Sequence, residues 1–457
     1  MDLHEQLRQH QQDHLLAAAE HLHEQERERF FDQLSALDLR LLKHLYDSRQ
    51  HSNSPPDVSR IQPLPVQPAN AHVNVAVPLG EEALHRGEVA VLMVAGGQGT
   101  RLRCDQPKGM FEIGPVSNKT LFQIHAEKVL ARSRRHAGRI PFLIMTSRAT
   151  HEETTGFFRR QNYFGLREED VFFFCQGTMP ALDLATGQLL LEAPGRLALS
   201  PDGHGGTLAA LYQAGLFDVL RKRGVRHVFY FQVDNPMVKV ADPLFIGQHI
   251  LAQSQVSSKV TPKFNPKDKV GNFVLHEGRC TMIEYIYLPE EMATRQDNSG
   301  KLLFRAGNPA IHVFDLGFLE GLQEHKHPLP FHPVCKKLKY WCHETKTVVE
   351  PKQENALKFE KFIFDVLPMA ERWLAVETTH REEFAPLKNL EGPDSPDTVR
   401  KAMSDLHADW LEKVGVRVPD REHQAVEISP LFALDAEEVA ERILSSWTLP
   451  GSMYLTR

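Results

Sequence analysis

The stretch VAVLMVAGGQGTRLRCDQPKGM, residues 89–110, decides the fold of this chain. Its first six residues are apolar and rich in β-branched side chains, which predicts a buried strand over 89–94. Three glycines within the next five residues let the backbone approach a ligand and adopt angles barred to other residues. Successive backbone N–H groups in such a turn form a hollow that binds anions. Arg101 and Lys108 add positive charge, so the stretch predicts a phosphate-binding loop after a central strand.

Two familiar phosphate-binding motifs do not fit this loop. A Walker loop requires Gly-Lys-Ser/Thr after four spacer residues, and that triplet is absent. A dinucleotide fingerprint requires a third glycine that leads straight into a helix, and none follows Gly97-Gln98-Gly99 at that step. The run Gly-Gly-x-Gly-Thr-Arg followed by Pro-Lys is a distinct and more specific pattern.

Outward from the loop, short apolar runs alternate with charged, helical stretches. Further strands are expected at 141–146, 171–175 and 227–233, and helices at 120–136, 152–163 and 207–223. This alternation predicts an α/β domain with a mixed, mostly parallel central sheet.

The flanking segments differ in texture from this domain. Residues 1–49 hold Leu and Phe at helical spacing, which predicts a helical cap packed by its apolar stripe, with a partner-binding arm as the alternative. The proline-rich stretch 53–71 is expected to be an extended connection and not a core element. We therefore expect an N-terminal helical segment with linker (1–85), a catalytic domain (86–385) and a small C-terminal lobe (386–457).

Composition narrows the class of protein. The chain has 457 residues, and 53 Lys and Arg against 59 Asp and Glu give a net charge of −6. This balance argues against a dedicated nucleic-acid binder or a polybasic membrane protein. The five cysteines form no CxxC pair, and the polar N-terminus lacks a signal-peptide core. No apolar run reaches membrane-spanning length, so a cytoplasmic protein with free thiols is expected.

The glycine-rich run with Pro107-Lys108-Gly109-Met110 resembles the signature of the UDP-sugar pyrophosphorylases, closest to the eukaryotic-type UDP-N-acetylglucosamine enzymes. The resemblance extends over about 80–430 through KTLFQIHAEKVL, FFFCQGTMPAL, SPDGHGG, VDNPMVKVADPLFIG, AGNPAIHVF, LKFEKFIFDVLP and FAPLKN. It implies a Rossmann-like, GT-A-like nucleotidyltransferase fold. It also implies a Mg²⁺-dependent reaction in which a sugar 1-phosphate attacks the α-phosphorus of UTP and pyrophosphate leaves.

The resemblance also implies roles for single residues. The residues implied to bind UTP are Ala95, Gly96, Gly97, Lys108, Gln176, Gly203, Asp234 and Lys358. Those implied to bind the sugar phosphate are His204, Glu284, Tyr285, Asn308 and Lys388. Arg101, Lys108 and Lys388 are implied to act in catalysis, and Asp234 to hold the metal.

Each role has an ordinary structural alternative. Arg101 could form a local ion pair, and Gln176 could cap a strand end. An Asp after an apolar run is often a turn or helix-cap residue, and Asp242 is expected to be one. Tyr285 could simply be half-buried, and Lys358 and Lys388 could be solvated surface lysines.

The chain departs from the family pattern at two places. His204 stands where relatives have an Asn that touches the sugar, and Leu102-Arg103 stands where they commonly have Leu-Gly. The preferred substrate is expected to be N-acetylglucosamine 1-phosphate, with glucose 1-phosphate, galactose 1-phosphate or a broad range as the alternative. A GT-A glycosyltransferase and a non-catalytic UDP-sugar sensor are further hypotheses. The oligomeric state is left open.

Overall fold

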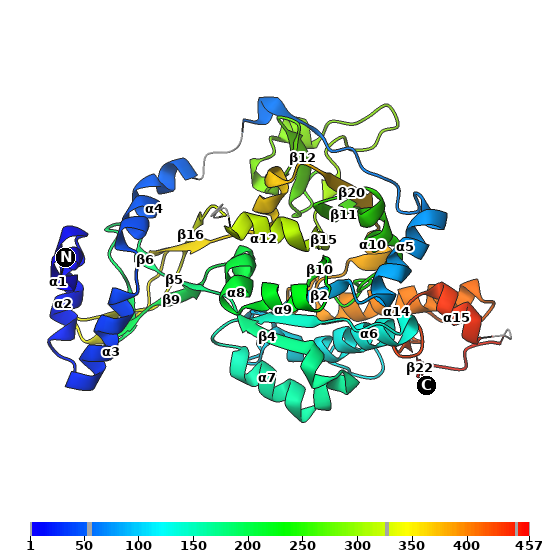
Figure 1. The fold of residues 1–457 in the computed structure, drawn as a ribbon, viewed down its shortest axis with the longest axis horizontal. Coiled ribbons are helices and arrows are strands. Elements are labelled where there is room, and N and C mark those ends of the chain that lie inside the picture. The colour runs from blue at the N-terminus through cyan, green and yellow to red at the C-terminus, as the bar shows by residue number, and fades with distance from the viewer. Residues whose placement is uncertain (1, 53–56, 325–328, 444–446, 457) are drawn as a thin grey trace. The chain divides into compact units, whose positions relative to one another are not determined.

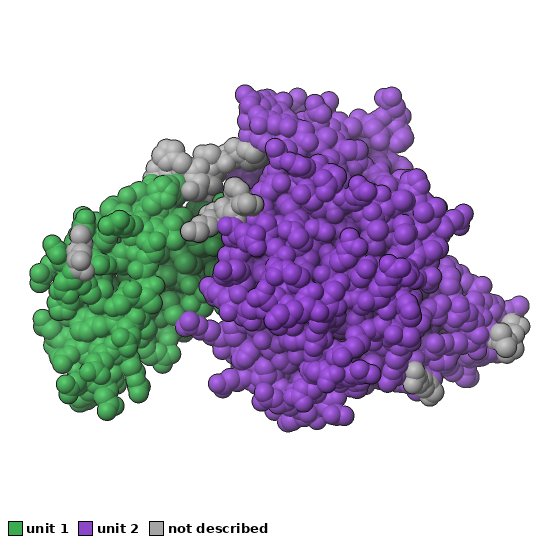
Figure 2. All heavy atoms as spheres, in the orientation of Figure 1, with its two compact units in different colours: residues 1–56, 176–207, 328–365 green, residues 57–175, 208–327, 366–457 purple. Residues whose placement is uncertain are grey.

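The computed structural model describes residues 2–52, 57–324, 329–443 and 447–456 (Figure 1). The chain groups into two compact units, coloured separately in Figure 2. Unit 1 comprises 1–56, 176–207 and 328–365, and unit 2 comprises 57–175, 208–327 and 366–457. The expected segments 1–85, 86–385 and 386–457 stay a prediction.

Unit 2 is built on a large mixed sheet, which confirms the expected α/β class. In spatial order its main path is β1 (Ile61–Pro63), β12 (Asn272–His276), β14 (Ala306–Gly307), β11 (Val256–Pro262), β15 (His312–Asp315), β10 (His227–Gln232), β2 (Val89–Val94), β3 (Phe142–Thr146) and β4 (Val171–Cys175). The half from β10 to β4 is parallel, and the pairs from β1 to β15 are antiparallel. Off this path, β13 (Arg279–Ile283) pairs with β12, and β20 (Trp373–Glu377) pairs with β11.

The parallel strands end together at one edge of the sheet. Gln232 of β10 lies opposite Val94 of β2, and Val94 lies opposite Met145 of β3. The loops that carry Ala95 and Asp234 therefore leave the sheet side by side. In open α/β sheets, this carboxyl edge is where ligands bind.

Helices cover this sheet and follow the sequence pattern closely. Thr120 caps α6 (Leu121–His136) by accepting a hydrogen bond from the Gln123 N–H. The expected helix 152–163 is α7 (His151–Arg160), and the expected helix 207–223 is broken into α8 (Thr207–Gln213) and α9 (Leu216–Lys222). The break falls at Gly215, whose φ of 66° belongs to the left-handed region.

Two helices on this sheet, α5 (Val73–His85) and α10 (Pro243–Leu251), pack backbone to backbone (Figure 1). A Cβ at Gly80 would collide with the Pro243 backbone, and one at Gly247 would collide with the backbone of Ala76. The C-terminal part of unit 2 adds α14 (Pro396–Lys413), β21 (Val426–Ile428), α15 (Ala436–Arg442) and β22 (Met453–Leu455).

The proline-rich stretch was expected to lack a core element, and this expectation is wrong for its second half. Residues 53–56 lie outside the described residues, but β1 pairs antiparallel with β12 and Ile61 is buried in a core cluster. Pro63 is tolerated because β1 is an edge strand, where a missing N–H breaks no ladder on its outer side.

Unit 1 holds the N-terminal helices α1 (Leu3–Gln9), α2 (Asp13–Ala19), α3 (Glu24–Ser35) and α4 (Leu39–Ser52). Leu7, Leu15 and Phe30 are fully buried and form one core with Leu189 and Phe359. The apolar stripe is therefore packed within its own unit. Among the described residues the unit also has three short sheets. They are built from β16 (His332–Lys336), β19 (Ala356–Glu360) and β6 (Leu182–Asp183), from β18 (Thr347–Val349), β17 (Tyr340–Cys342), β7 (Leu191–Ala193) and β8 (Arg196–Leu197), and from β5 (Thr178–Pro180) and β9 (Leu199–Pro201).

No helix among the described residues is both long enough and apolar enough to cross a bilayer.

Candidate active site

The glycine-rich loop folds back on itself beyond β2. Ala95 is fully buried, and its N–H donates to Met145 O at 2.7 Å. The Lys108 N–H donates to Gly97 O at 3.1 Å, and Gln98 forms an antiparallel bridge with Pro107. These contacts bring Lys108 back beside the start of the loop, although ten residues separate it from Gln98.

The loop glycines act through size and not through unusual angles. Neither Gly96, Gly97 nor Gly99 has a positive φ, so the expectation of angles barred to other residues is wrong here. A Cβ at Gly97 would meet nothing within 4 Å, which leaves open space beside the backbone. The left-handed residue of this stretch is Arg103, at φ 52°.

Lys108 and Asp234 meet at the carboxyl edge of the sheet. Lys108 Nζ lies 3.5 Å from Asp234 Oδ2 and 3.3 Å from Leu387 O, to which it donates a hydrogen bond. The Leu387 N–H donates to Asp234 O at 2.8 Å. The structure therefore brings the phosphate-loop lysine, the strand-end aspartate and the segment that carries Lys388 into one cluster.

Asn235 holds this cluster in place, a role that the sequence did not reveal. Its Nδ2 donates to Glu383 O at 2.7 Å, and its Oδ1 accepts from Ala385 N at 3.2 Å and from Met237 N at 3.3 Å. Asn235 is 3% exposed. Because its partners lie about 150 residues further along the chain, only the VDNP pattern itself could have drawn attention to it.

A buried ion pair also holds Glu383, the residue whose backbone carbonyl binds Asn235. Lys259 Nζ lies 2.8 Å from Glu383 Oε2 and 3.3 Å from Asp242 Oδ2. Burial alone would raise the pKa of Glu383, but Lys259 and Lys239 lower it to about 2. Asp242 also caps α10 by accepting from the Leu244 N–H, which confirms its expected turn role.

Two further cations of the predicted site keep their charged ends free within the described residues. Arg101 is exposed and forms neither a hydrogen bond nor an ion pair there, so no local ion pair of Arg101 is seen. Lys388 is half-buried, and only its backbone is bonded, the N–H donating to Asp394 O at 2.8 Å. Their catalytic roles stay predictions.

Three of the predicted sugar contacts, Glu284, Tyr285 and Asn308, follow strands on the antiparallel half of the sheet. Asn272 of β12 lies opposite both Ile283 and Gly307, the residues that directly precede Glu284 and Asn308. The Asn308 N–H donates to Gly271 O at 3.0 Å, and its Oδ1 accepts from the Ala310 N–H at 2.8 Å. Tyr285 is 37% exposed, more than ordinary half-buried packing would leave.

Asn272 is a second residue that the sequence reasoning missed. Its side chain is fully buried, and neither Oδ1 nor Nδ2 has a hydrogen-bond partner among the described residues. A buried amide without partners is costly and marks a place where a ligand or a water molecule completes the site.

In unit 1, Gly203 and His204 form a tight turn beside Lys361. Gly203 has φ 84°, and a Cβ there would collide with Lys361 O, so the protein itself requires glycine. His204 Nδ1 accepts from the Ile363 N–H at 3.1 Å, and its ring lies 5.4 Å from that of Phe362. Burial and the neighbouring His332 lower the pKa of His204 to about 4. The ring is therefore neutral near pH 7, and its proton sits on Nε2.

The other predicted nucleotide contacts of unit 1 are also enclosed. Gln176 is 8% exposed, and no hydrogen bond of its side chain is found within the described residues. Lys358 lies in β19 opposite Val334, and burial lowers the pKa of its ammonium, helped by Lys336 and opposed by Glu360. Lys358 is therefore no ordinary solvated lysine, and its role toward phosphate stays a prediction.

Asp234 would bind a metal ion with few other protein side chains as ligands. The described residues contain no group of three or more His, Cys, Asp or Glu that could bind one. A single strand-end carboxylate fits Mg²⁺, because this hard cation takes one or two carboxylates and draws its other ligands from phosphates and water. The pairing of Asp234 with Lys108 at 3.5 Å leaves its second oxygen available.

A mixed α/β sheet with a glycine-rich turn, a lysine and an aspartate at its carboxyl edge defines a nucleotide-binding transferase fold. The family described as UTP--glucose-1-phosphate uridylyltransferase matches residues 40–434, and the chain belongs to it.

Similar proteins agree with this assignment. The chain is 38% identical over 371 residues to the UDP-N-acetylglucosamine pyrophosphorylase of Saccharomyces cerevisiae, covering 79% of this chain and 77% of that protein. It is 33% identical over 461 residues to UDP-N-acetylglucosamine diphosphorylase 2 of Arabidopsis thaliana, covering 95% and 90%. The crystal structure of the Trypanosoma brucei UDP-N-acetylglucosamine pyrophosphorylase superposes with a TM-score of 0.80 at 28% identity, covering 96% of this chain and 95% of that one.

Proposed function

We propose that this chain transfers a uridylyl group from UTP to N-acetylglucosamine 1-phosphate, releasing pyrophosphate. Membership of the uridylyltransferase family supports the reaction. The names of the relatives favour N-acetylglucosamine 1-phosphate over glucose 1-phosphate. The observation that carries the proposal is the Lys108–Asp234 cluster at the end of two adjacent parallel strands, beside an open glycine turn.

The reaction requires well-positioned substrates and fixed positive charge more than a strong base. A phosphate oxygen of the sugar phosphate forms a bond to the α-phosphorus, and the bond from that phosphorus to the oxygen of the leaving pyrophosphate breaks. Negative charge grows on the leaving group, so fixed cations and N–H donors lower the barrier. Lys108 is positioned for this by the Leu387 carbonyl, and the unpaired charges of Arg101 and Lys388 are available to the phosphates.

Asp234 is the proposed ligand of Mg²⁺. When bound, this ion would neutralise phosphate charge and orient the oxygens of the triphosphate. The structure's own contribution is to hold the Asp234 backbone through Leu387 and the next residue, Asn235, through Glu383 and Ala385.

The sugar is proposed to lie against Glu284, Tyr285 and Asn308. A carboxylate accepts hydrogen bonds from sugar hydroxyls, and an amide can donate to an acetyl oxygen. Asn272 lies on β12, between the two strands that end directly before Glu284 and Asn308, and its unpaired amide adds a polar group that an N-acetyl substituent could satisfy. The role of His204, which belongs to unit 1, toward the sugar phosphate stays a prediction.

A pyrophosphate-release assay tests the proposal. Purified protein with UTP and Mg²⁺ is incubated with the 1-phosphates of N-acetylglucosamine, glucose and galactose in turn. We expect pyrophosphate release when UTP, Mg²⁺ and a sugar 1-phosphate are all present, and no release when the sugar phosphate is left out. The highest kcat/KM should be that for N-acetylglucosamine 1-phosphate. An absence of release with every sugar phosphate contradicts the reaction, and a higher kcat/KM with glucose 1-phosphate contradicts the substrate.

The reverse reaction separates this proposal from a glycosyltransferase. Incubated with UDP-N-acetylglucosamine and pyrophosphate, a pyrophosphorylase produces UTP, whereas a glycosyltransferase of the same fold does not.

A further inference from the structure

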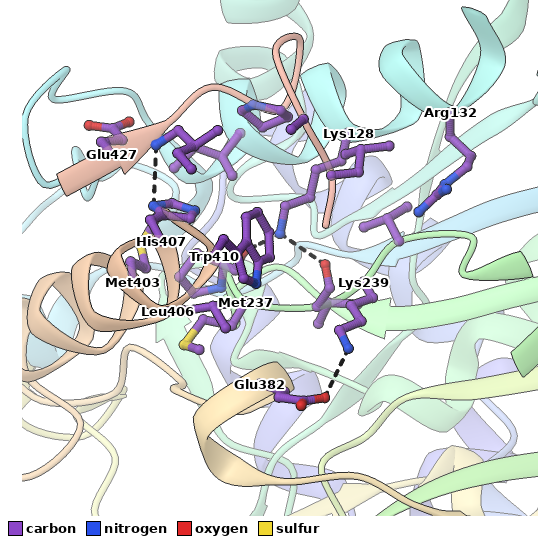
Figure 3. Close-up of a pocket in the computed structure, with 18 residues that line it drawn as sticks. Lys128, Arg132, Met237, Lys239, Glu382, Met403, Leu406, His407, Trp410 and Glu427 are labelled. Atoms are coloured by element: carbon purple, nitrogen blue, oxygen red, sulfur yellow. Dashed lines mark hydrogen bonds and ion pairs between the residues drawn. The ribbon is translucent and has the colours of Figure 1, made fainter. Parts of the chain in front are cut away.

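Unit 2 contains a second hollow, which none of the predicted site residues lines. It lies between α6, residues 236–240, α14 and the C-terminal segment 427–434 (Figure 3). The space free of atoms amounts to about 620 Å³, including the part open to solvent.

One wall of the hollow carries three cations. Lys128 and Arg132 lie one turn apart on α6, and Lys239 lies on the loop that follows Asp234. Lys128 Nζ donates to Val238 O at 2.9 Å and also to Pro236 O. Lys239 Nζ is paired with Glu382 at 2.9 Å. Burial disfavours the charged form of Lys128 and lowers its pKa to about 7, so an anion bound beside it would favour the protonated ammonium.

Arg132 is the cation without a partner. It is only 4% exposed, its Nε has no hydrogen bond, and it forms no ion pair within the described residues. Asp242, Asp435 and Glu438 attract its charge, but none of them contacts it. A buried guanidinium normally satisfies its fork of N–H donors, because leaving them unmade is costly.

The carboxylates that line the hollow are already engaged. Glu382 pairs with Lys239, and Glu427 accepts hydrogen bonds from Val116 N, Ser117 N and the Ser117 hydroxyl. His407 is uncharged near pH 7, because burial and then Lys128 lower its pKa to about 4. The unpaired charge of the lining is therefore positive.

The opposite wall is apolar. Met403, Leu406 and Trp410 project from successive turns of α14, and Met237 faces them from the loop (Figure 3). A thioether and an indole surface suit an aromatic or aliphatic group.

We propose that this hollow is a binding site for a small organic anion, with its phosphate or carboxylate on Arg132 and Lys128 and its apolar body against Trp410. Its floor begins two residues after Asp234, and Lys128 holds that floor through the Pro236 and Val238 carbonyls. An anion competes with these carbonyls for the Lys128 ammonium, so occupancy loosens the segment that carries Asp234. This coupling, unlike the site itself, rests on the proposed function of Asp234.

Binding is tested with phenyl phosphate, using the quenching of tryptophan fluorescence in the full chain. Phenol supplies the same body without charge, and inorganic phosphate supplies the charge without the body. The chain has four tryptophans, so Trp410→Phe reports whether the probe is quenching the one in the hollow. Arg132→Met removes the unpaired cation, and Arg134→Met makes the same change at an exposed position of α6.

We expect phenyl phosphate to bind about tenfold tighter than phenol or inorganic phosphate, since charge-assisted hydrogen bonds and apolar contact act together. Arg132→Met should weaken phenyl phosphate about tenfold and leave phenol unchanged, Arg134→Met should have no effect, and Trp410→Phe should abolish the quenching. Equal affinity in Arg132→Met and wild type, or persistent quenching in Trp410→Phe, would overturn the site. If Arg132→Met does not fold, Arg132→Gln and Lys128→Met are measured against the same expectations.

The coupling is tested by pyrophosphate release at saturating substrates. Phenyl phosphate should lower kcat about fivefold in wild type, and Arg132→Met should require about tenfold more phenyl phosphate for the same decrease. Binding without any change in kcat overturns the coupling and leaves the site standing. A chain without activity refutes the proposed function, and the fluorescence measurement still decides the site.

Discussion

Asn235 is linked to two lysine–carboxylate pairs: it follows Asp234 of one pair in the sequence, and it donates a hydrogen bond to the backbone of Glu383 in the other. The two pairs differ in burial. Lys108 and Asp234 are 3.5 Å apart with side chains 18% and 14% exposed, whereas Lys259 and Glu383 are 2.8 Å apart and 7% and 1% exposed. A partly hydrated pair can exchange its partner for a ligand, but a buried pair cannot be opened without a large penalty. The comparison assigns chemistry to the first pair and support to the second.

Removing Lys108 should produce the largest effect. We expect Lys108→Ala to lower kcat/KM roughly a thousandfold, because a fixed cation aimed at developing charge is worth that much in a shielded site. Its free energy of unfolding should change by less than about 1 kcal/mol, as a partly exposed pair contributes little to stability. Turnover and urea unfolding of the same preparations measure both.

Lys222→Ala is the matched control for that substitution. Lys222 is exposed on α9, and its side chain forms no hydrogen bond or ion pair within the described residues. Wild-type turnover in Lys108→Ala would remove the glycine-rich loop from the mechanism.

Removing the buried carboxylate should reverse this pattern. We expect Glu383→Gln to lower the free energy of unfolding by about 3–5 kcal/mol, because Lys259 loses its charged partner in a buried site. The fractional loss of turnover should be smaller than the fractional loss of the free energy of unfolding, provided that turnover is measured well below the unfolding midpoint. If Glu383→Gln unfolds as wild type does, the supporting role assigned to this pair is wrong.

The same pair predicts how stability depends on acid. The pKa of Glu383 is lowered to about 2 from its ordinary value of 4.5, so its contribution is present above pH 4.5. It is lost as the pH falls from 4.5 toward 2, because the unfolded state takes up the proton first. Urea unfolding across this interval should show a shallower pH dependence in Glu383→Gln than in wild type.

Asn235 links the two pairs, and its substitution sharpens the comparison. We expect Asn235→Ala to lower kcat roughly ten- to a hundredfold through misplacement of Asp234, with a stability loss of about 1–3 kcal/mol from unmade hydrogen bonds. Asn235→Asp keeps the acceptor for Ala385 N but loses the donor to Glu383 O. It should therefore retain more activity than the alanine variant. Equal kcat in wild type and Asn235→Ala would show that the Asp234 segment needs no such support.

A feature could be predicted from the sequence when the residues that determine it lie close together in the chain. Local patterns predicted the strand 89–94 and the helix that starts after Thr120, and the structure contains both. A local pattern also singled out Lys108, which lies beside Asp234. The helix break at Gly215 was missed, because one glycine within an apolar period weakens a helix without ending it. The glycine loop was assigned special backbone angles that it lacks, since composition does not distinguish small size from a positive φ.

The candidate site was harder to predict wherever it depends on distant parts of the chain. The bond from Asn235 to Glu383 spans 148 residues, and no local period records it. The lack of a hydrogen-bond partner for the Asn272 amide within the described residues is likewise visible only in three dimensions. Residue types could suggest which side chains carry charge, but not which of them are left without a partner.

The smallest expected effect concerns His204. We expect His204→Asn to change the ratio of kcat/KM between N-acetylglucosamine 1-phosphate and glucose 1-phosphate by about tenfold or less, because one hydrogen bond is altered. A pH profile gives a readout independent of activity: the pKa of about 4, below the ordinary 6.5, means that the folded state resists protonation of His204. Stability is therefore lost as the pH falls from 6.5 toward 4, and His204→Asn should flatten this part of the curve. Arg196→Gln, an exposed change in the same unit, should alter neither measurement. A flattened pH curve with an unchanged sugar ratio would assign His204 to the packing of its turn with Phe362 and Ile363, and leave sugar choice to Glu284 and Asn308.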